Sequence, residues 1–310
     1  MNPGYRALRE SAAWLDLFGR GKILAYGDDR VRLLHAMTTN HVEGIAEGSG
    51  CYAFFLNAQG RILGDVNLFR MPDHLLLDTE PETAAKLCQH LNHYIIADDV
   101  TLEDRAAEIA TVAIEGPAAA HILAAMGAPV PETSHGHAAW GHRTVARVDS
   151  TGAGGCFVFL PADEKAEFLN RLEATGVVPA TWEDALVVRL ENGKPRYGHD
   201  ITEDYLPQET QAIHAIHFTK GCYLGQEIVE RIHSRGHVNR LLVRLLIDTT
   251  SPPAKGTALP GGEITSAAFS PALGKVAALG YVRAEHARAG ADLLVDGVRA
   301  TVLAPHSPGR

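Results

Sequence analysis

The pattern of apolar residues changes near residue 240, and this change constrains the fold more than any single motif does. Upstream, helix-like and strand-like segments alternate irregularly and no repeat of fixed period is present. Downstream, five short strand-like runs follow one another without a convincing helix, at residues 241–247, 263–269, 275–282, 293–295 and 298–303. Such a series is typical of a small barrel or sandwich. The sequence therefore predicts an α+β chain with a boundary at 241–250, a mixed region over 1–240 and a small β-barrel over 241–310.

A β-hairpin is predicted early in the mixed region. Residues 51–56 and 61–70 have the composition of strands, and Asn57-Ala58-Gln59-Gly60 between them is a tight loop. The second strand carries Asp65. Taken alone, this carboxylate is either an exposed strand residue or part of a functional site.

A helix with clear end signals carries an unusual carboxylate. Thr181 and Asp184 form a capping pattern at its start, and Gly193 is the residue type that ends helices. Glu191 then falls in the last turn, where the helix dipole disfavours a negative charge. A local rule broken at one position often marks a functional position. The alternative is a solvated helix end.

The segment Lys220-Gly221-Cys222-Tyr223-Leu224-Gly225-Gln226-Glu227 concentrates the reactive chemistry. A helix is predicted to begin just after it, so Cys222 precedes a positive helix end and lies close to Lys220 in sequence. Both features favour a thiolate over a thiol. The residues alone leave open a nucleophile, a redox thiol, a metal ligand or a buried cysteine in a tight connection.

Charge and cysteine usage exclude several classes of protein. The net charge of −9 provides no basic surplus for a nucleic-acid backbone, so we expect no direct nucleic-acid partner. No apolar run reaches the roughly 18 residues that a membrane span needs, and we expect no membrane partner. The start of the chain lacks the features of a signal peptide. Four dispersed cysteines without a CxxC pair indicate reduced thiols and a cytoplasmic location.

Sixteen histidines raise the question of a metal site. His214 and His217 are three residues apart, His233 and His237 are four apart, and Cys222 lies between the pairs. One cysteine and several histidines could bind zinc or share a cluster with a partner. These spacings match no closed site, so we expect no stable metal ion held by this chain alone.

The segment 220–227 resembles the signature of the YgfZ family, which belongs to the superfamily of the glycine cleavage T-protein, an aminomethyltransferase. Further resemblance covers residues 57–65, 115–117, 189–195, 206–209 and 265–271. It implies a cloverleaf of three lobes around a central hole that holds tetrahydrofolate or a one-carbon-substituted folate. It also implies a discontinuous first lobe and a second lobe at roughly residues 52–140.

The same resemblance implies the site. Glu191 matches the superfamily glutamate that binds the pterin. A carboxylate can accept two parallel hydrogen bonds from the 2-amino group and the ring N–H at the edge of a pterin. Asp65 matches one of two adjacent acidic residues in the T-protein hairpin, but Gly64 replaces its neighbour. Cys222 and Asp65 are the predicted reactive residues. The predicted folate contacts are Asn57, Asp65, Glu191, Lys220, Tyr223, Gln226 and Arg231.

Three functions follow from the resemblance as hypotheses. The first is a folate-binding accessory protein for iron–sulfur cluster assembly or repair, whose partners are the assembly machinery or client enzymes and whose effect on tRNA modification is indirect. The second is a tetrahydrofolate-dependent aminomethyltransferase or methyltransferase that uses Asp65. The third is a folate sensor without catalysis. Gly64 and the Cys222 signature favour the first.

Overall fold

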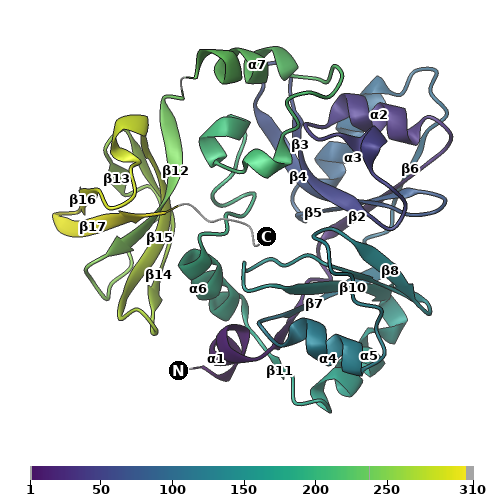
Figure 1. The fold of residues 1–310 in the computed structure, drawn as a ribbon, viewed down its shortest axis with the longest axis horizontal. Helices are drawn as coiled ribbons and strands as arrows, with labels where there is room; N and C mark the ends of the chain where they lie inside the picture. The colour runs from purple at the N-terminus through teal and green to yellow at the C-terminus, as the bar shows by residue number, and fades with distance from the viewer. Residues whose placement is uncertain (1, 237, 305–310) are drawn as a thin grey trace.

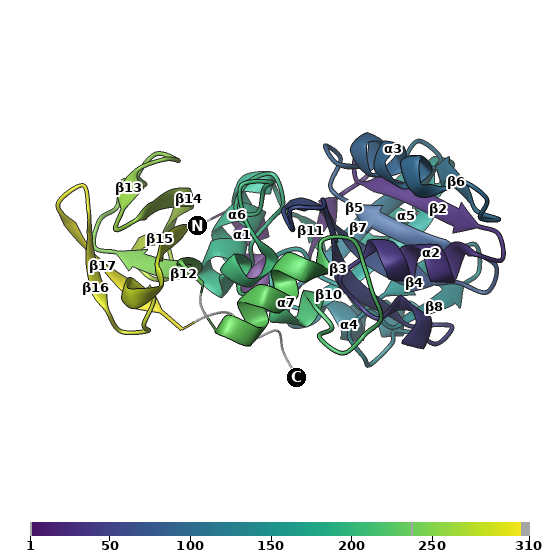
Figure 2. The same cartoon turned by 90° about the horizontal axis from the view of Figure 1, so that it is seen from above.

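Three β-sheets organise the molecule, each at the centre of one lobe (Figure 1). The structure is a computed structural model and describes residues 2–236 and 238–304. The view from above shows the C-terminal sheet at one end and the other two sheets at the opposite end (Figure 2). Helices from the 182–235 part of the chain lie between the two ends. The predicted three-lobed α+β fold is therefore confirmed.

The first lobe is built on a five-stranded sheet. Its strands are β2 (Gly21–Tyr26), β3 (Gly50–Leu56), β4 (Ile62–Arg70), β5 (Leu75–Thr79) and β6 (Thr101–Asp104), in the spatial order β3-β4-β5-β2-β6. Helices α2 (Arg30–Met37) and α3 (Ala84–Tyr94) pack on one face, and the 3-10 turn η1 (Val42–Gly44) follows α2. The predicted hairpin is confirmed, because β3 and β4 pair in antiparallel fashion.

The second lobe is built on a six-stranded sheet. Its strands are β1 (Ala13–Asp16), β7 (Ile109–Glu115), β8 (His137–Trp140), β9 (Arg143–Ala146), β10 (Gly155–Pro161) and β11 (Val178–Pro179), in the order β11-β1-β7-β10-β9-β8. Helices α4 (Ala119–Ala125) and α5 (Lys165–Glu173) cover one face, and η2 (Ala162–Glu164) leads into α5. The first lobe is inserted between β1 and β7. Residues 52–140, predicted as one lobe, are divided between the two sheets.

The first two sheets pack against each other through a shared apolar cluster. Leu24 and Phe69 come from the first sheet, and Leu15, Phe157 and Phe159 come from the second lobe. All five side chains are buried. Burial of such surface is the main stabilising term in a fold. The two lobes therefore form one continuous body, which fixes the loops at their common edge.

Helix α6 (Trp182–Asn192) joins the second lobe to the third. Its capping box of Thr181 and Asp184 and its left-handed end at Gly193 (φ 70°) are as predicted. One side packs on the N-terminal helix α1 (Pro3–Glu10), where Val188 lies with Tyr5. Another side contacts the third lobe through Leu190. The helix therefore sets the spacing between the lobes.

The third lobe consists of one barrel-like sheet. Its strands are β12 (Arg240–Ile247), β13 (Ala258–Leu259), β14 (Gly262–Ser270), β15 (Lys275–Arg283), β16 (Asp292–Val295) and β17 (Val298–Leu303), in the order β13-β14-β15-β12-β17-β16. The turn η5 (Ala284–His286) is its one short helical element among the described residues. All five predicted strands are present, and β13 is additional. The end of the predicted barrel, residues 305–310, lies outside the described residues.

Between α6 and the third lobe the chain forms η3 (Pro207–Thr210), η4 (Ile213–Ala215) and helix α7 (Gln226–Arg235). Helix α7 runs beside the β3–β4 hairpin (Figure 1). Among the helices in the described part of the chain, none combines the length and the apolar character needed to cross a membrane.

Candidate functional site

A cavity of about 980 Å³ opens where the three lobes meet. This volume lies at the upper end of the range for small-molecule sites, about 300–1,000 Å³. Its walls come from every lobe and from α6, and include Tyr52, Asp65, Glu80, Arg147, Trp182 and Arg244. Because these residues are far apart in sequence, the cavity exists only in the assembled fold.

Strand β4 supplies two polar side chains to the cavity. Asp65 and Asn67 both line it, whereas the alternate residues Val66 and Leu68 point into the core beneath α2 and α3. This alternation follows from the two-residue period of a strand. Pairing with β3 places Tyr52 directly opposite Asn67 and next to Asp65. The hairpin therefore presents a compact polar group to the cavity.

Asp65 has one satisfied and one unsatisfied oxygen. The hydroxyl of Tyr52 donates a hydrogen bond to Oδ2 of Asp65 at 2.7 Å. Its Oδ1 is buried and has no hydrogen-bond partner in the described part of the chain. Burial, and next the negative charge of Glu80, raise the pKa of Asp65 to about 6. An unpaired buried acceptor costs free energy, so this atom marks a place where a ligand's donor group would be bound.

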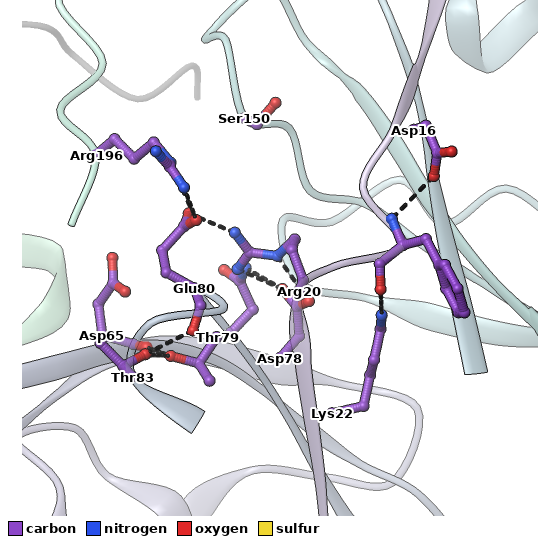
Figure 3. A network of polar contacts seen from close by, with 12 residues as sticks. Asp16, Arg20, Lys22, Asp65, Asp78, Thr79, Glu80, Thr83, Ser150 and Arg196 are labelled. Atoms are coloured by element: carbon purple, nitrogen blue, oxygen red, sulfur yellow. Dashed lines mark hydrogen bonds and ion pairs between the residues drawn. The ribbon is translucent and has the colours of Figure 1, made fainter. Parts of the chain in front are cut away.

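A chain of alternating charges borders Asp65 (Figure 3). Arg20 donates two bonds of 2.8 Å to Asp78 and one of 2.5 Å to Glu80. Glu80 also accepts bonds of 3.0 and 2.7 Å from Arg196. Burial alone would raise the pKa of Glu80, but the two guanidinium groups outweigh it and hold that pKa below its usual value. The network fixes the polar wall, to which Arg20, Glu80 and Arg196 all contribute.

The neighbouring wall holds a neutral histidine. His135 lies 3.1 Å, through Nε2, from Oδ1 of Asn67. Burial, and next the charge of Lys194, lower the pKa of His135 to about 4. The imidazole is therefore uncharged at neutral pH and acts as a hydrogen-bonding group.

The cavity lining also contains cations and an aromatic surface. Arg244 lines the cavity from β12, and its Nε is buried without a hydrogen-bond partner among the described residues. Burial lowers the pKa of Arg244, and Glu191 partly opposes this. Arg147 and Lys194 add positive charge, and Trp182 lines the cavity with 54% of its surface exposed. These residues are suited to an anionic group and to a flat ring.

Glu191 is not among the residues that line the cavity. Its Oε1 accepts 2.5 Å hydrogen bonds from Tyr5 and Ser270, and its Oε2 pairs with Arg9. Helix α1, α6 and β14 thus meet at this carboxylate, which is buried. The three partners compensate for its position in the last turn of α6. Its predicted role as the pterin acceptor stays a prediction.

The segment 220–227 also lies outside the cavity lining. The Lys220 ammonium donates to carbonyl oxygens at the C-terminal end of α2, including that of His35. Burial lowers the pKa of Lys220 to about 8. The amide of Leu224 donates to the carbonyl of Ala36 at 3.0 Å. Between these two anchors the side chain of Cys222 is exposed, which excludes the interpretation of a buried structural cysteine.

The rest of this segment packs against the hairpin loop. Tyr223 is buried in an apolar cluster, and burial raises the pKa of its hydroxyl. Oε1 of Gln226 accepts from the Tyr223 amide at 3.3 Å. Gly225 has φ 81°, and a Cβ there would lie 2.7 Å from the carbonyl oxygen of Asn57. This close approach requires glycine and brings the signature segment to the hairpin loop.

Two further predicted contacts have local partners. The Asn57 side chain accepts 3.0 Å bonds from the amides of Gln59 and Arg61, which shapes the turn. Arg231 is exposed on α7 and lies 3.5 Å from Glu227. Of the predicted site residues, the structure places Asp65 alone in the lining of the cavity. For the other predicted residues, contact with folate stays a prediction.

Several lining residues were not predicted from the sequence. One local signal existed: Asn67 follows Asp65 by two positions in the middle of a predicted strand, so both side chains must share a face. Tyr52 follows from the same hairpin register. Glu80 and Arg244 carry no local signal, because only the tertiary fold brings them to the cavity.

Comparisons with known proteins agree with this architecture. Residues 2–220 match the model of the GCVT N-terminal domain, and residues 240–306 match the model of the glycine cleavage T-protein C-terminal barrel domain. An aminomethyltransferase of Herpetosiphon aurantiacus is 30% identical over 96% of this chain and 87% of the relative. An aminomethyltransferase of Chloroherpeton thalassium is 28% identical over 92% of this chain and 83% of its own.

A solved structure shows the same fold. The glycine cleavage system aminomethyltransferase T from Bartonella henselae aligns with a TM-score of 0.90. The alignment covers 99% of this chain and 89% of that chain, at 22% sequence identity. This likeness extends over all three lobes.

Proposed function

We propose that this chain, which belongs to the glycine cleavage T-protein family, binds a reduced folate in its central cavity and handles a one-carbon unit beside Asp65. The observation that carries the proposal is the buried, unpartnered Oδ1 of Asp65 in a cavity of about 980 Å³. A reduced pterin offers N–H donors that such an acceptor would bind.

The donor groups of the cavity complement the other end of a folate. Arg244 presents a buried Nε without a partner among the described residues, and Arg147 and Lys194 add cations. The glutamate part of a folate carries carboxylates, which guanidinium groups bind well. The exposed indole of Trp182 lies in the same lining. The residues present therefore fit a molecule with donors at one end, flat rings and an anionic tail.

Asp65 is suited to stabilise positive charge. When bound, tetrahydrofolate supplies the nitrogens that accept a one-carbon unit. The Tyr52 hydroxyl holds one carboxylate oxygen of Asp65 in place and leaves the other free. Above pH 6 this carboxylate is mostly ionised, and its low-dielectric surroundings strengthen its interaction with a developing cation. We therefore favour a tetrahydrofolate-dependent one-carbon transferase of the glycine cleavage type.

Calorimetric titration with tetrahydrofolate tests the binding part of this proposal. Wild-type protein should bind one folate per chain, and Trp182→Ala should weaken binding by about tenfold, because stacking of a base on an aromatic ring contributes about 1–3 kcal/mol. Leu294→Ala is the control, since Leu294 is 65% exposed on the third lobe and absent from the lining. Equal affinity for Trp182→Ala and wild type would remove Trp182 from the site.

The same titration tests the remaining predicted contacts. Glu191→Ala must weaken folate binding if Glu191 accepts from the pterin, although its three present partners would first have to release it. Arg231→Ala must weaken binding of polyglutamylated folate more than binding of the monoglutamate if Arg231 attracts the tail. These roles stay predictions.

The exposure of Cys222 favours a second candidate function. It is the one exposed cysteine of the four in this chain, and accessible thiols are the ones that react or bind metals with a partner. The resemblance of its segment to the YgfZ signature points to maintenance of iron–sulfur enzymes. Folate would bind in the cavity in this function too. This second proposal includes client iron–sulfur enzymes as partners and a cytoplasmic location.

Replacing Cys222 with serine separates the two candidates. If the thiol serves iron–sulfur maintenance, Cys222→Ser should abolish support of iron–sulfur enzyme activity in cells that lack the wild-type chain. Folding and folate affinity should be unchanged, because the side chain is exposed and outside the cavity lining. Thr219→Ala, at an exposed neighbouring position, is the control. Full activity of Cys222→Ser would eliminate the thiol role.

A further inference from the structure

Two histidines and a glutamate meet behind the first sheet, away from the cavity lining. His35 lies in the last turn of α2, and His41 and Glu43 follow at the connection to η1. One potential ligand atom from each residue lies within 4.8 Å of the other two. Nε2 of His35 is 3.8 Å from Oε2 of Glu43. None of these residues lines the folate cavity.

The local fold holds the two imidazoles together. The rings of His35 and His41 pack edge to face, with centroids 5.1 Å apart. A Cβ at Gly44 would lie 2.6 Å from Nδ1 of His41, so the absence of a side chain at Gly44 allows this ring position. The arrangement therefore depends on the short turn between α2 and η1 and not on chance contact of surface chains.

The surroundings of His35 determine which ring nitrogen is available. Its side chain is 8% exposed, and Nε2 is the nitrogen that lies near the carboxylate of Glu43. A neutral imidazole is the ligand form. The amide of Glu43 lies 3.4 Å from Nδ1 of His35, at the long limit of hydrogen bonding. This amide is the donor and Nδ1 the acceptor, so a cation can bind at Nε2 only if the ring proton moves to Nδ1 and this weak contact is given up.

A third imidazole lies beside the cluster. The ring of His217 packs on that of His41, with centroids 5.0 Å apart. Nδ1 of His217 is buried and has no hydrogen-bond partner in the described part of the chain. A buried polar atom without a partner is costly unless a ligand satisfies it. His217 is not among the residues whose ligand atoms lie within 4.8 Å of one another, so it lies beside the cluster and would have to move to join it.

We propose that His35, His41 and Glu43 bind one divalent transition-metal ion, with His217 as the nearest additional ligand. Two imidazoles and one carboxylate form the donor set of open zinc sites and of non-haem Fe²⁺ sites. Because Zn–N and Zn–O bonds are about 2.0–2.2 Å long, the cluster must close by roughly 1 Å. Glu43 has an exposed side chain and can supply this movement by rotation. The proposal goes beyond folate binding and does not depend on it.

Titration of the metal-free full-length chain with Zn²⁺, followed by calorimetry, tests this site. Wild type should bind one Zn²⁺ per chain. His41→Ala and Glu43→Gln should each weaken Zn²⁺ binding by at least about 100-fold. Loss of a residue that only hydrogen-bonds to a metal ligand already lowers metal affinity by about 10- to 100-fold. Glu47→Gln removes the same charge at an exposed position outside the cluster and should leave the affinity unchanged. Unchanged thermal unfolding of the metal-free variants shows that they fold.

Co²⁺ provides a second readout of the ligands. Absorption bands of a four- or five-coordinate Co²⁺ complex should appear with wild type and be absent with His41→Ala. Zn²⁺ binding that survives both cluster substitutions, or that Cys222→Ser or Glu47→Gln abolishes, would overturn the proposal. Tetrahydrofolate affinity should be equal in His41→Ala and wild type, so failure of this site and failure of the folate proposal are distinguishable.

Discussion

Asp65→Asn should lower kcat for tetrahydrofolate-dependent one-carbon transfer by about 100- to 1,000-fold, the range for loss of one preorganised electrostatic group in an active site. KM for the folate should change little, because asparagine keeps the size of the side chain and an acceptor oxygen for the ligand. A loss confined to kcat indicates an interaction made in the transition state. Asp163→Asn, at an exposed carboxylate of the second lobe, is the control.

The pH dependence of the same reaction identifies the group. Burial and Glu80 raise the pKa of Asp65 to about 6, so the carboxyl group is mostly protonated at pH 5 and mostly ionised at pH 7. The rate of the wild-type enzyme should therefore rise with pH through a midpoint near 6, and this rise should be absent in Asp65→Asn. A variant that keeps both the rate and the pH profile of wild type would show that Asp65 has no part in the chemistry.

Arg20→Leu should lower the free energy of unfolding by about 3–5 kcal/mol, as expected when one partner of a buried ion pair is removed. The Arg20 side chain is 9% exposed and bonds to both Asp78 and Glu80. Its loss leaves Asp78, which is fully buried, without the cation that compensates its charge. Glu80 retains Arg196. Urea denaturation followed by circular dichroism measures the change.

Two further variants separate charge compensation from lost packing. Arg32→Leu is the matched control, because Arg32 also pairs with two carboxylates but its side chain is 63% exposed. Its effect should be much smaller, since exposed ion pairs contribute little. Adding Asp78→Asn to Arg20→Leu should restore part of the lost stability by removing the unpaired charge. Equal effects of Arg20→Leu and Arg32→Leu would contradict the role given to the buried network.

Features with a local cause could be predicted from the sequence. The capping box of α6 and the glycine that ends it act within one or two turns, and the structure has both. The alternation of strands and turns after Arg240 likewise reflects short-range periodicity, and all five predicted strands are present. The two-residue strand β13 carried too few residues to give a periodic signal.

Features that depend on tertiary packing could not be predicted. Arg20 and Asp78 are 58 positions apart, and nothing in either neighbourhood indicates their contact. Helical spacing placed Glu191 in the last turn of α6 but did not reveal that α1 and β14 surround it. Residues 52–140 are divided between two sheets because β7 and β8, at the end of that range, belong to the sheet that contains β1. The strands β3 to β6 belong to the other sheet.

The histidines illustrate the same limit. The spacings of His214 with His217 and of His233 with His237 gave no closed metal site, and His237 lies outside the described residues. The cluster that could bind a metal instead combines His35, His41 and Glu43 across the turn after α2. Their sequence separations of six and two match no regular element, so only the folded turn brings them together.

A crystal structure of the protein grown with tetrahydrofolate is the most direct test of the claim that the cavity between the lobes is the folate site. The account predicts one folate per chain in that cavity, with a pterin nitrogen within hydrogen-bond distance of Oδ1 of Asp65. A folate bound elsewhere, or a pterin that leaves Oδ1 of Asp65 without a partner, would contradict it.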